Sequence, residues 1–118
     1  MTQILIVEDN LKLLKMNKSN LEKAGFAVET ALNGAEAIAI MDKKKIDVML
    51  LDLLIPKVNG FGVMEHARKK KYGFPIIVFT NLDERIDRKK CKELGATDFL
   101  IKSDTDFPDI IARIRAAL

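Results

Sequence analysis

Five short apolar runs alternate along the chain with segments of helical periodicity. Runs of this length, rich in Ile, Leu, Val and Phe, are typical of strands buried on both faces of a parallel sheet. They predict strands over 3–7, 26–31, 47–51, 75–79 and 97–101. The segments between them predict helices over 11–24, 34–43 after a cap at Asn33, 60–71, a stretch capped by Asn81 or Asp83 that ends at 94–95, and a last helix from 107 or 108.

This alternation favours an α/β fold in which helices cover both faces of a five-stranded parallel sheet, a three-layer sandwich with right-handed crossovers. The periods and lengths leave the strand order open. With 118 residues, 48% of them hydrophobic, the chain is expected to form one domain, 1–118. The fourth helix has only a thin apolar stripe, Ile86, Cys91 and Leu94, and is expected to be the least firmly packed.

Composition and charge exclude several classes of function. No apolar run approaches the roughly 20 residues of a membrane helix, and acids appear as early as Glu8, so neither a membrane span nor a signal peptide is expected. A single cysteine, Cys91, suits a reducing cytoplasm. The net charge is only +3, and the lysine clusters at 43–45, 69–71 and 89–90 lie on different helices without interleaved aromatic residues. They indicate solvated helix faces rather than nucleic-acid binding.

Polar residues stand at the ends of four predicted strands. They are Glu8 and Asp9, Asp52, Thr80, and Lys102. The carboxyl ends of parallel strands share one edge of the sheet, where ligands bind in open α/β folds. Three neighbouring carboxylates repel one another unless a cation neutralises them, and their hard oxygens suit Mg²⁺ or Mn²⁺ rather than zinc. The lysine and the hydroxyl suit an anion on that metal, so the pattern predicts a phosphoryl site.

Asp52 lies at the centre of this pattern, after the apolar run 48–51 and before Pro56. A carboxylate there is a candidate nucleophile that would form an acyl phosphate. The chain has no glycine-rich phosphate loop of either common type, so a nucleotide substrate is not expected. Taken singly, each of these polar residues reads as a strand end or a helix cap; the functional interpretation depends on their combination.

The combination closely resembles the receiver domain of bacterial two-component response regulators, of the chemotaxis-regulator type, over essentially the whole chain. The segment 52–60, Asp-Leu-Leu-Ile-Pro-Lys-Val-Asn-Gly, follows the family's Asp-x-x-apolar-Pro-x-x-Asn/Asp-Gly pattern. The other matching residues are the acidic pair Glu8 and Asp9, the hydroxyl residue Thr80, the lysine Lys102, and the aromatic residue Phe99 three positions before it.

The resemblance implies a flavodoxin-like sheet of order 2-1-3-4-5 and a mechanism. Asp52 would accept a phosphoryl group from a phosphohistidine on a sensor kinase or phosphotransfer protein. Mg²⁺ would be held by Asp9, Asp52 and the backbone carbonyl of Leu54, with Glu8 acting through water. Thr80 would then bond the phosphoryl oxygen and Phe99 would turn inward. This shift between two states would change the surface formed by the fourth helix, the fifth strand and the fifth helix.

The same resemblance implies partners and a location. That surface would contact a downstream protein or an output domain, or form a phosphorylation-dependent dimer. The protein would be a cytoplasmic switch rather than an enzyme, beyond self-phosphorylation from small donors and slow self-dephosphorylation.

Three departures from the family pattern carry expectations of their own. Ser103 replaces the proline that usually follows the lysine, so we expect a trans Lys102–Ser103 bond and a reshaped loop, because a cis bond before serine costs about 3 kcal/mol. Asn81 replaces a small residue and would either crowd the phosphoryl group or bond to it. Leu54 and Leu82 occupy the positions that tune dephosphorylation. They cannot orient an attacking water, which predicts a long-lived phosphoryl group.

Two alternatives remain open from the sequence. An aspartate-nucleophile phosphatase would need a second acid two residues beyond Asp52, where Leu54 stands. A pseudo-receiver, which keeps the fold as a binding module without phosphorylation, is favoured by Asn81 and Ser103. The intact set of acids, hydroxyl and lysine argues against it.

Overall fold

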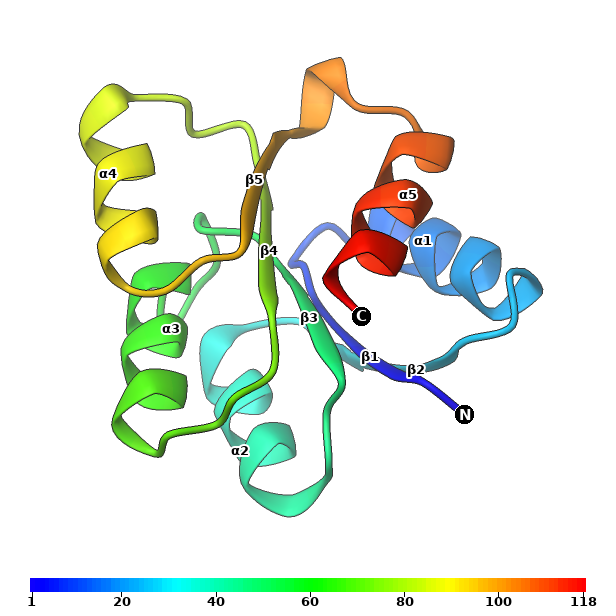
Figure 1. The fold of residues 1–118 in the computed structure, drawn as a ribbon, viewed down its shortest axis with the longest axis horizontal. Helices are drawn as coiled ribbons and strands as arrows, with labels where there is room; N and C mark the ends of the chain where they lie inside the picture. Colours follow the sequence, from blue (N-terminus) through cyan, green and yellow to red (C-terminus); the bar gives the residue numbers. More distant parts are fainter.

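A computed structural model describes residues 1–118 as one parallel sheet with helices on both faces (Figure 1). The strand order is β2-β1-β3-β4-β5, and every neighbouring pair is parallel. The strands are β1 (Gln3–Val7), β2 (Ala27–Ala31), β3 (Val48–Leu51), β4 (Ile76–Thr80) and β5 (Asp98–Ile101). The helices are α1 (Leu11–Lys23), α2 (Gly34–Lys43), α3 (Gly60–Lys69), α4 (Arg85–Glu93), α5 (Phe107–Ala117) and the short 3₁₀ helix η1 (Lys102–Asp104). The predicted sandwich and its strand order are confirmed.

Two hydrophobic clusters hold the layers together, one on each face of the sheet. Side chains alternate along each strand, so Ile4 and Ile6 of β1 join the cluster under α1 and α5, while Leu5 and Val7 join the cluster under α2, α3 and α4 (Figure 1). The central strand β3 is buried at all four positions. This explains why its sequence is a continuous apolar run rather than an alternating one.

Helix α4 differs from the sequence prediction in two respects. It begins at Arg85 with Glu84 as an N-cap that makes no side-chain capping bond, so the predicted cap at Asn81 or Asp83 is wrong. Ile86 is 75% exposed, whereas Cys91 is buried. Five residues of an α-helix turn through about 500°, which places these two side chains roughly 140° apart. Cys91 is the one fully buried residue of α4, in agreement with the expected weak packing.

The Cys91 thiol has no reactive character in this environment. It is 1% exposed, and burial, helped by the nearby Asp87 carboxylate, raises its pKa to about 11. A thiol with this pKa stays protonated at neutral pH and is a poor nucleophile. Cys91 is therefore a packing residue.

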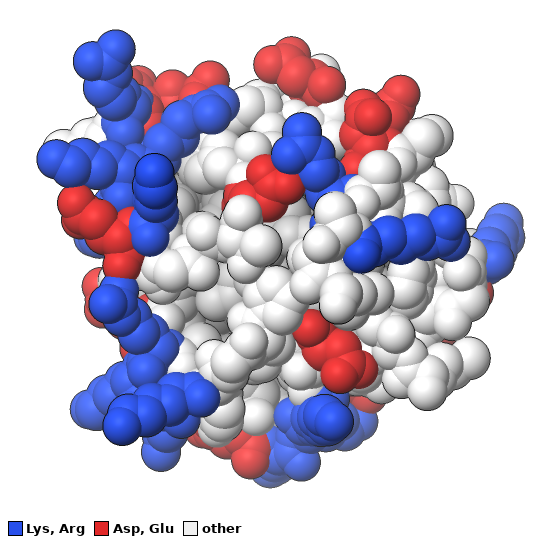
Figure 2. Space-filling view, in the orientation of Figure 1, with Lys and Arg blue, Asp and Glu red and all other residues white.

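The surface lysines are spread over several elements. All residues of the clusters 43–45, 69–71 and 89–90 are exposed. Figure 2 shows Lys and Arg side chains gathered along the side of the molecule where α4 and α3 lie, with acidic side chains among them. None of the helices is both long enough and apolar enough to cross a membrane.

Candidate functional site

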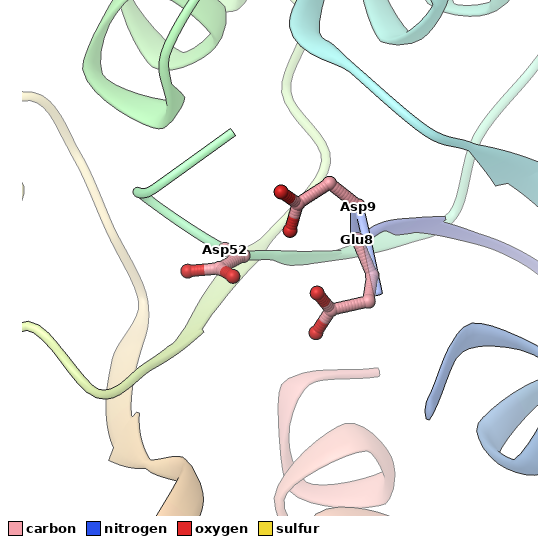
Figure 3. Close-up of side chains that lie close together, drawn as sticks. All are labelled: Glu8, Asp9 and Asp52. Atoms are coloured by element: carbon pink, nitrogen blue, oxygen red, sulfur yellow. The ribbon is translucent and has the colours of Figure 1, made fainter. Parts of the chain in front are cut away.

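The carboxyl ends of β1 and β3 bring three acids together (Figure 3). Val7 pairs with Leu51, so the next residues, Glu8 and Asp52, leave the sheet side by side. One carboxylate oxygen from each of Glu8, Asp9 and Asp52 lies within 4.8 Å of the others. Glu8 and Asp52 are buried, whereas Asp9 is exposed and leaves the cluster open to water.

Lys102 supplies the cation that faces these acids. It lies at the start of η1, just after β5, and its Nζ is 2.7 Å from Asp52 Oδ2 and also pairs with Glu8. Burial alone would lower the pKa of Lys102, but its hydrogen bonds to the two carboxylates and the attraction of their charges together outweigh burial and raise the pKa. Its ammonium group is therefore charged at neutral pH.

For Glu8, burial outweighs the interactions that favour the charged form. Burial raises the pKa of its carboxyl, although Lys102 and the Asn10 backbone N–H both stabilise the carboxylate form. A single ammonium group thus leaves the three acids with excess negative charge, which favours a further cation at this edge.

The loop after Asp52 is held by backbone contacts. The Leu54 N–H donates to Asp52 Oδ1 at 3.1 Å, which fixes the carboxylate that Lys102 holds on its other oxygen. The Gly60 N–H donates to the Leu53 carbonyl at 3.0 Å. A Cβ on Gly60 would lie 2.6 Å from the Asp52 carbonyl oxygen, so only glycine permits this approach.

A second glycine holds the far end of the same loop. Gly34, the first residue of α2, donates its N–H to the Pro56 carbonyl at 3.3 Å. A Cβ there would lie 1.8 Å from the Val58 carbonyl oxygen. The constraint on Gly34 was not predicted, because no pattern in the chain shows that the N-terminus of α2 touches the loop after β3.

Thr80 and Phe99 lie on the two strands beyond β3. Thr80 ends β4, is fully buried, and its Oγ1 accepts a hydrogen bond from the Leu82 N–H at 3.2 Å. Phe99 is half-buried in β5, with the Arg88 guanidinium of α4 at 4.7 Å from the ring centroid. Arg88 also donates from Nε to Asp83 Oδ1 at 2.7 Å. Phe99 is therefore held by α4 in this structure.

Two of the departures from the family pattern, Asn81 and Ser103, are in contact. Every peptide bond is trans, including Lys102–Ser103, as the substitution of serine for proline predicts. Residues Lys102–Asp104 form the 3₁₀ helix η1. The Ser103 N–H donates to Asn81 Oδ1 at 3.0 Å. The Asn81 side-chain oxygen is thus bonded to the neighbouring loop, a contact that was not predicted.

The structure thus brings Glu8, Asp9, Asp52 and Lys102 together, as predicted, and places Thr80 at the same edge of the sheet. Leu54 is 57% exposed, and its N–H donates to Asp52 Oδ1. The role of its carbonyl stays a prediction.

Comparison with protein families gives one match over nearly the whole chain. The family model described as "Response regulator receiver domain" matches residues 4–115. Similar curated proteins include the alkaline phosphatase synthesis transcriptional regulatory protein PhoP of Bacillus subtilis, 35% identical over 98% of this chain and 48% of that protein. The transcriptional regulatory protein CpxR homolog of Haemophilus influenzae is 39% identical over 100% of this chain and 51% of that protein. The chain spans about half the length of these relatives.

Solved structures agree in fold over the full chain. The chemotaxis protein CheY4 of Vibrio cholerae aligns with a TM-score of 0.92 and 28% identity, covering 100% of this chain and 99% of that one. The response regulator protein TrrA of Thermotoga maritima, solved in complex with Mg²⁺ and BeF, aligns with a TM-score of 0.88 and 28% identity, covering 100% of both chains.

Proposed function

Because the chain belongs to the response regulator receiver domain family, we propose that it is a phosphorylation-dependent switch whose phosphoryl acceptor is Asp52. The observation that carries the proposal is the contact of Asp52 with Lys102 inside a cluster of three acids. The Asp52 carboxylate thereby lies between the Lys102 ammonium group and two further carboxylates that could hold a metal ion. No other cluster of three acids, His or Cys in the structure has this geometry.

The donor set fits a magnesium ion. The cluster offers carboxylate oxygens only, two of them buried and one open to water, and Mg²⁺ prefers oxygen ligands and keeps several of its waters. Asp9, Asp52 and the Leu54 carbonyl would hold the ion, with Glu8 acting through water; Mn²⁺ has the same ligand preference. When bound, the metal neutralises negative charge on the phosphoryl oxygens.

In this reaction the protein positions the nucleophile, Asp52, and a positive charge, that of Lys102. An oxygen of Asp52 attacks phosphorus of a phosphohistidine on a kinase or phosphotransfer protein. The O–P bond forms, the N–P bond breaks, and the electron pair leaves with the imidazole nitrogen, which takes up a proton. Lys102 stabilises the negative charge of the phosphoryl oxygens as this occurs, and Leu54 orients the acceptor carboxylate through its N–H.

The signal would be transmitted by movement of the loop after β4 and of Phe99 on β5. For the Thr80 hydroxyl to reach the phosphoryl group, the loop 81–84 shifts and the hydrogen bond from Leu82 is lost. Phe99 then turns inward and leaves Arg88, which alters the surface of α4, β5 and α5. The weak packing of α4 suits an element that changes position. A downstream partner, an output domain or a second copy would read this surface.

The decisive test is phosphorylation of the purified chain. Incubation with Mg²⁺ and acetyl phosphate is expected to add the mass of one phosphoryl group to the native chain and none to Asp52→Asn. Asp104→Asn, the same substitution at an exposed acid, is the matched control and is expected to behave as the native chain does. If the native chain gains no mass, and its NMR amide spectrum does not change on addition of Mg²⁺ and beryllofluoride, the pseudo-receiver alternative is favoured.

The lifetime of the phosphoryl group gives a second prediction. The exposed Leu54 side chain and the half-buried Leu82 side chain offer no group that orients a hydrolytic water. Changing Leu54→Gln is expected to speed loss of the phosphoryl group by about tenfold, because a side-chain amide can position that water. Leu54→Met retains size without a polar group and should leave the rate unchanged. Equal decay rates in the native chain and in both variants would contradict the prediction.

A further inference from the structure

The hydrogen bond between Asn81 and Ser103 joins the two loops that carry Thr80 and Lys102. The β4–β5 ladder ends where Thr80 pairs with Ile101. Beyond that pair, the N–H of Ser103, two residues after Ile101, donates to Oδ1 of Asn81, the residue after Thr80, at 3.0 Å. A side-chain carbonyl therefore continues the ladder beyond the end of the sheet.

This bond fixes the backbone on the far side of Lys102. Ile101 is held by its pairing with Thr80, and its carbonyl accepts a hydrogen bond from Thr105 Oγ1 at 2.7 Å. Ser103 is held by Asn81, so Lys102 lies between two anchored residues. A long, flexible lysine side chain reaches a set position more often when its own backbone is fixed.

The donor in this bond is a backbone N–H, which sets a condition on residue 103. Proline has no N–H and would leave Asn81 Oδ1 without this partner. The serine hydroxyl takes no part in the bond. Asn81 and the N–H of residue 103 therefore act as one pair, and the identity of the side chain at 103 is of little consequence as long as it is not proline.

We propose that Asn81 is a positioning residue for phosphoryl transfer, which holds the Lys102–Ser103 backbone so that the Lys102 ammonium stays beside Asp52. The inference rests on the proposed function, because it assigns a role in the same reaction. Asn81 touches neither Asp52 nor the acids by any hydrogen bond in this structure, and it acts through the backbone of its neighbour.

The test compares rates of phosphorylation by acetyl phosphate at saturating Mg²⁺. Asn81→Ala and Asn81→Leu both remove the acceptor, and leucine retains the size of the side chain. Each is expected to be slower than the native chain by about tenfold. Ser103→Ala keeps the backbone N–H and should react at the native rate. The Mg²⁺ affinity should be native in Ser103→Ala and native or higher in the Asn81 variants, because the bond holds none of the acids and a displaced ammonium group leaves their cluster more negative. The Ser103 amide should exchange faster with solvent only in the Asn81 variants.

Three results would overturn the inference. The first is a native rate in Asn81→Ala, and the second is a loss in Ser103→Ala equal to that in Asn81→Ala. The third is a parallel loss of Mg²⁺ affinity and thermal stability, which would indicate general structural damage. Failure of the proposed function is a different result, since the native chain itself would then take up no phosphoryl group.

Discussion

Replacing Gly60 by alanine is expected to lower the free energy of unfolding by about 1–3 kcal/mol and to weaken Mg²⁺ binding at the acid cluster. The added Cβ would lie 2.6 Å from the Asp52 carbonyl oxygen and 2.7 Å from the Leu53 Cα. Both are backbone atoms of the segment 52–53, so relief of the clash requires Asp52 or the start of α3 to move. Urea unfolding and calorimetric titration with Mg²⁺ measure the two effects.

A loss of stability in Gly60→Ala is informative because helix propensity alone predicts a gain in stability. Gly60 is the first residue of α3, and alanine is favoured over glycine within helices by about 1 kcal/mol. Gly73→Ala is the matched control: a Cβ there meets no atom within 4 Å, and its stability should be unchanged or slightly raised. A Gly60→Ala chain that is as stable as Gly73→Ala and binds Mg²⁺ normally would show that the close approach to Asp52 does not constrain the site.

The parts of this molecule that could be predicted are those that local periodicity or topology determines. A strand such as Val48–Leu51, which is buried on both faces, is recognised in the sequence as an unbroken apolar run. Once five such strands are parallel, their carboxyl ends must share an edge. Residues as distant in sequence as Glu8 and Lys102 could therefore be placed in one cluster before any coordinates were known.

The features that escaped prediction depend on contacts between loops. Asn81 has the side chain of a helix cap, but in three dimensions its oxygen faces the Ser103 N–H, and α4 begins later, at Arg85. Gly34 is an ordinary helix start in sequence, and its constraint arises only because Val58 lies against it. Neither contact has a signature in residue spacing, since each joins segments brought together by the sheet.

Lys102→Met is expected to destabilise the chain at neutral pH by about 3 kcal/mol, the lower end of the range for breaking a buried ion pair, because exposed Asp9 leaves the pocket open to water. The substitution leaves the buried carboxylates of Glu8 and Asp52 facing each other without their cation. It should also slow phosphorylation by about a hundredfold, since no fixed charge then stabilises the phosphoryl oxygens. Lys12→Met, at an exposed position on α1, is the control for loss of a lysine.

The pH dependence of the stability lost in Lys102→Met identifies the cause of that loss. Burial already raises the pKa of Glu8, and removal of Lys102 takes away an interaction that lowers it, so the pKa of Glu8 rises further in the variant. A carboxyl whose pKa is higher in the folded state than in the unfolded state favours folding at low pH, and that contribution is lost as pH rises through the folded pKa. The deficit of Lys102→Met relative to the native chain should therefore be small at about pH 4 and grow towards about pH 7.

Mg²⁺ should reverse the deficit at neutral pH. Without the ammonium group the acid cluster is more negative and attracts a divalent cation more strongly, so saturating Mg²⁺ is expected to stabilise Lys102→Met more than the native chain. Urea unfolding at both pH values, with and without Mg²⁺, measures all of these differences. A loss of stability that is the same at both pH values and indifferent to Mg²⁺ would mean that Lys102 contributes packing rather than charge, and the electrostatic account of the site would fail with it.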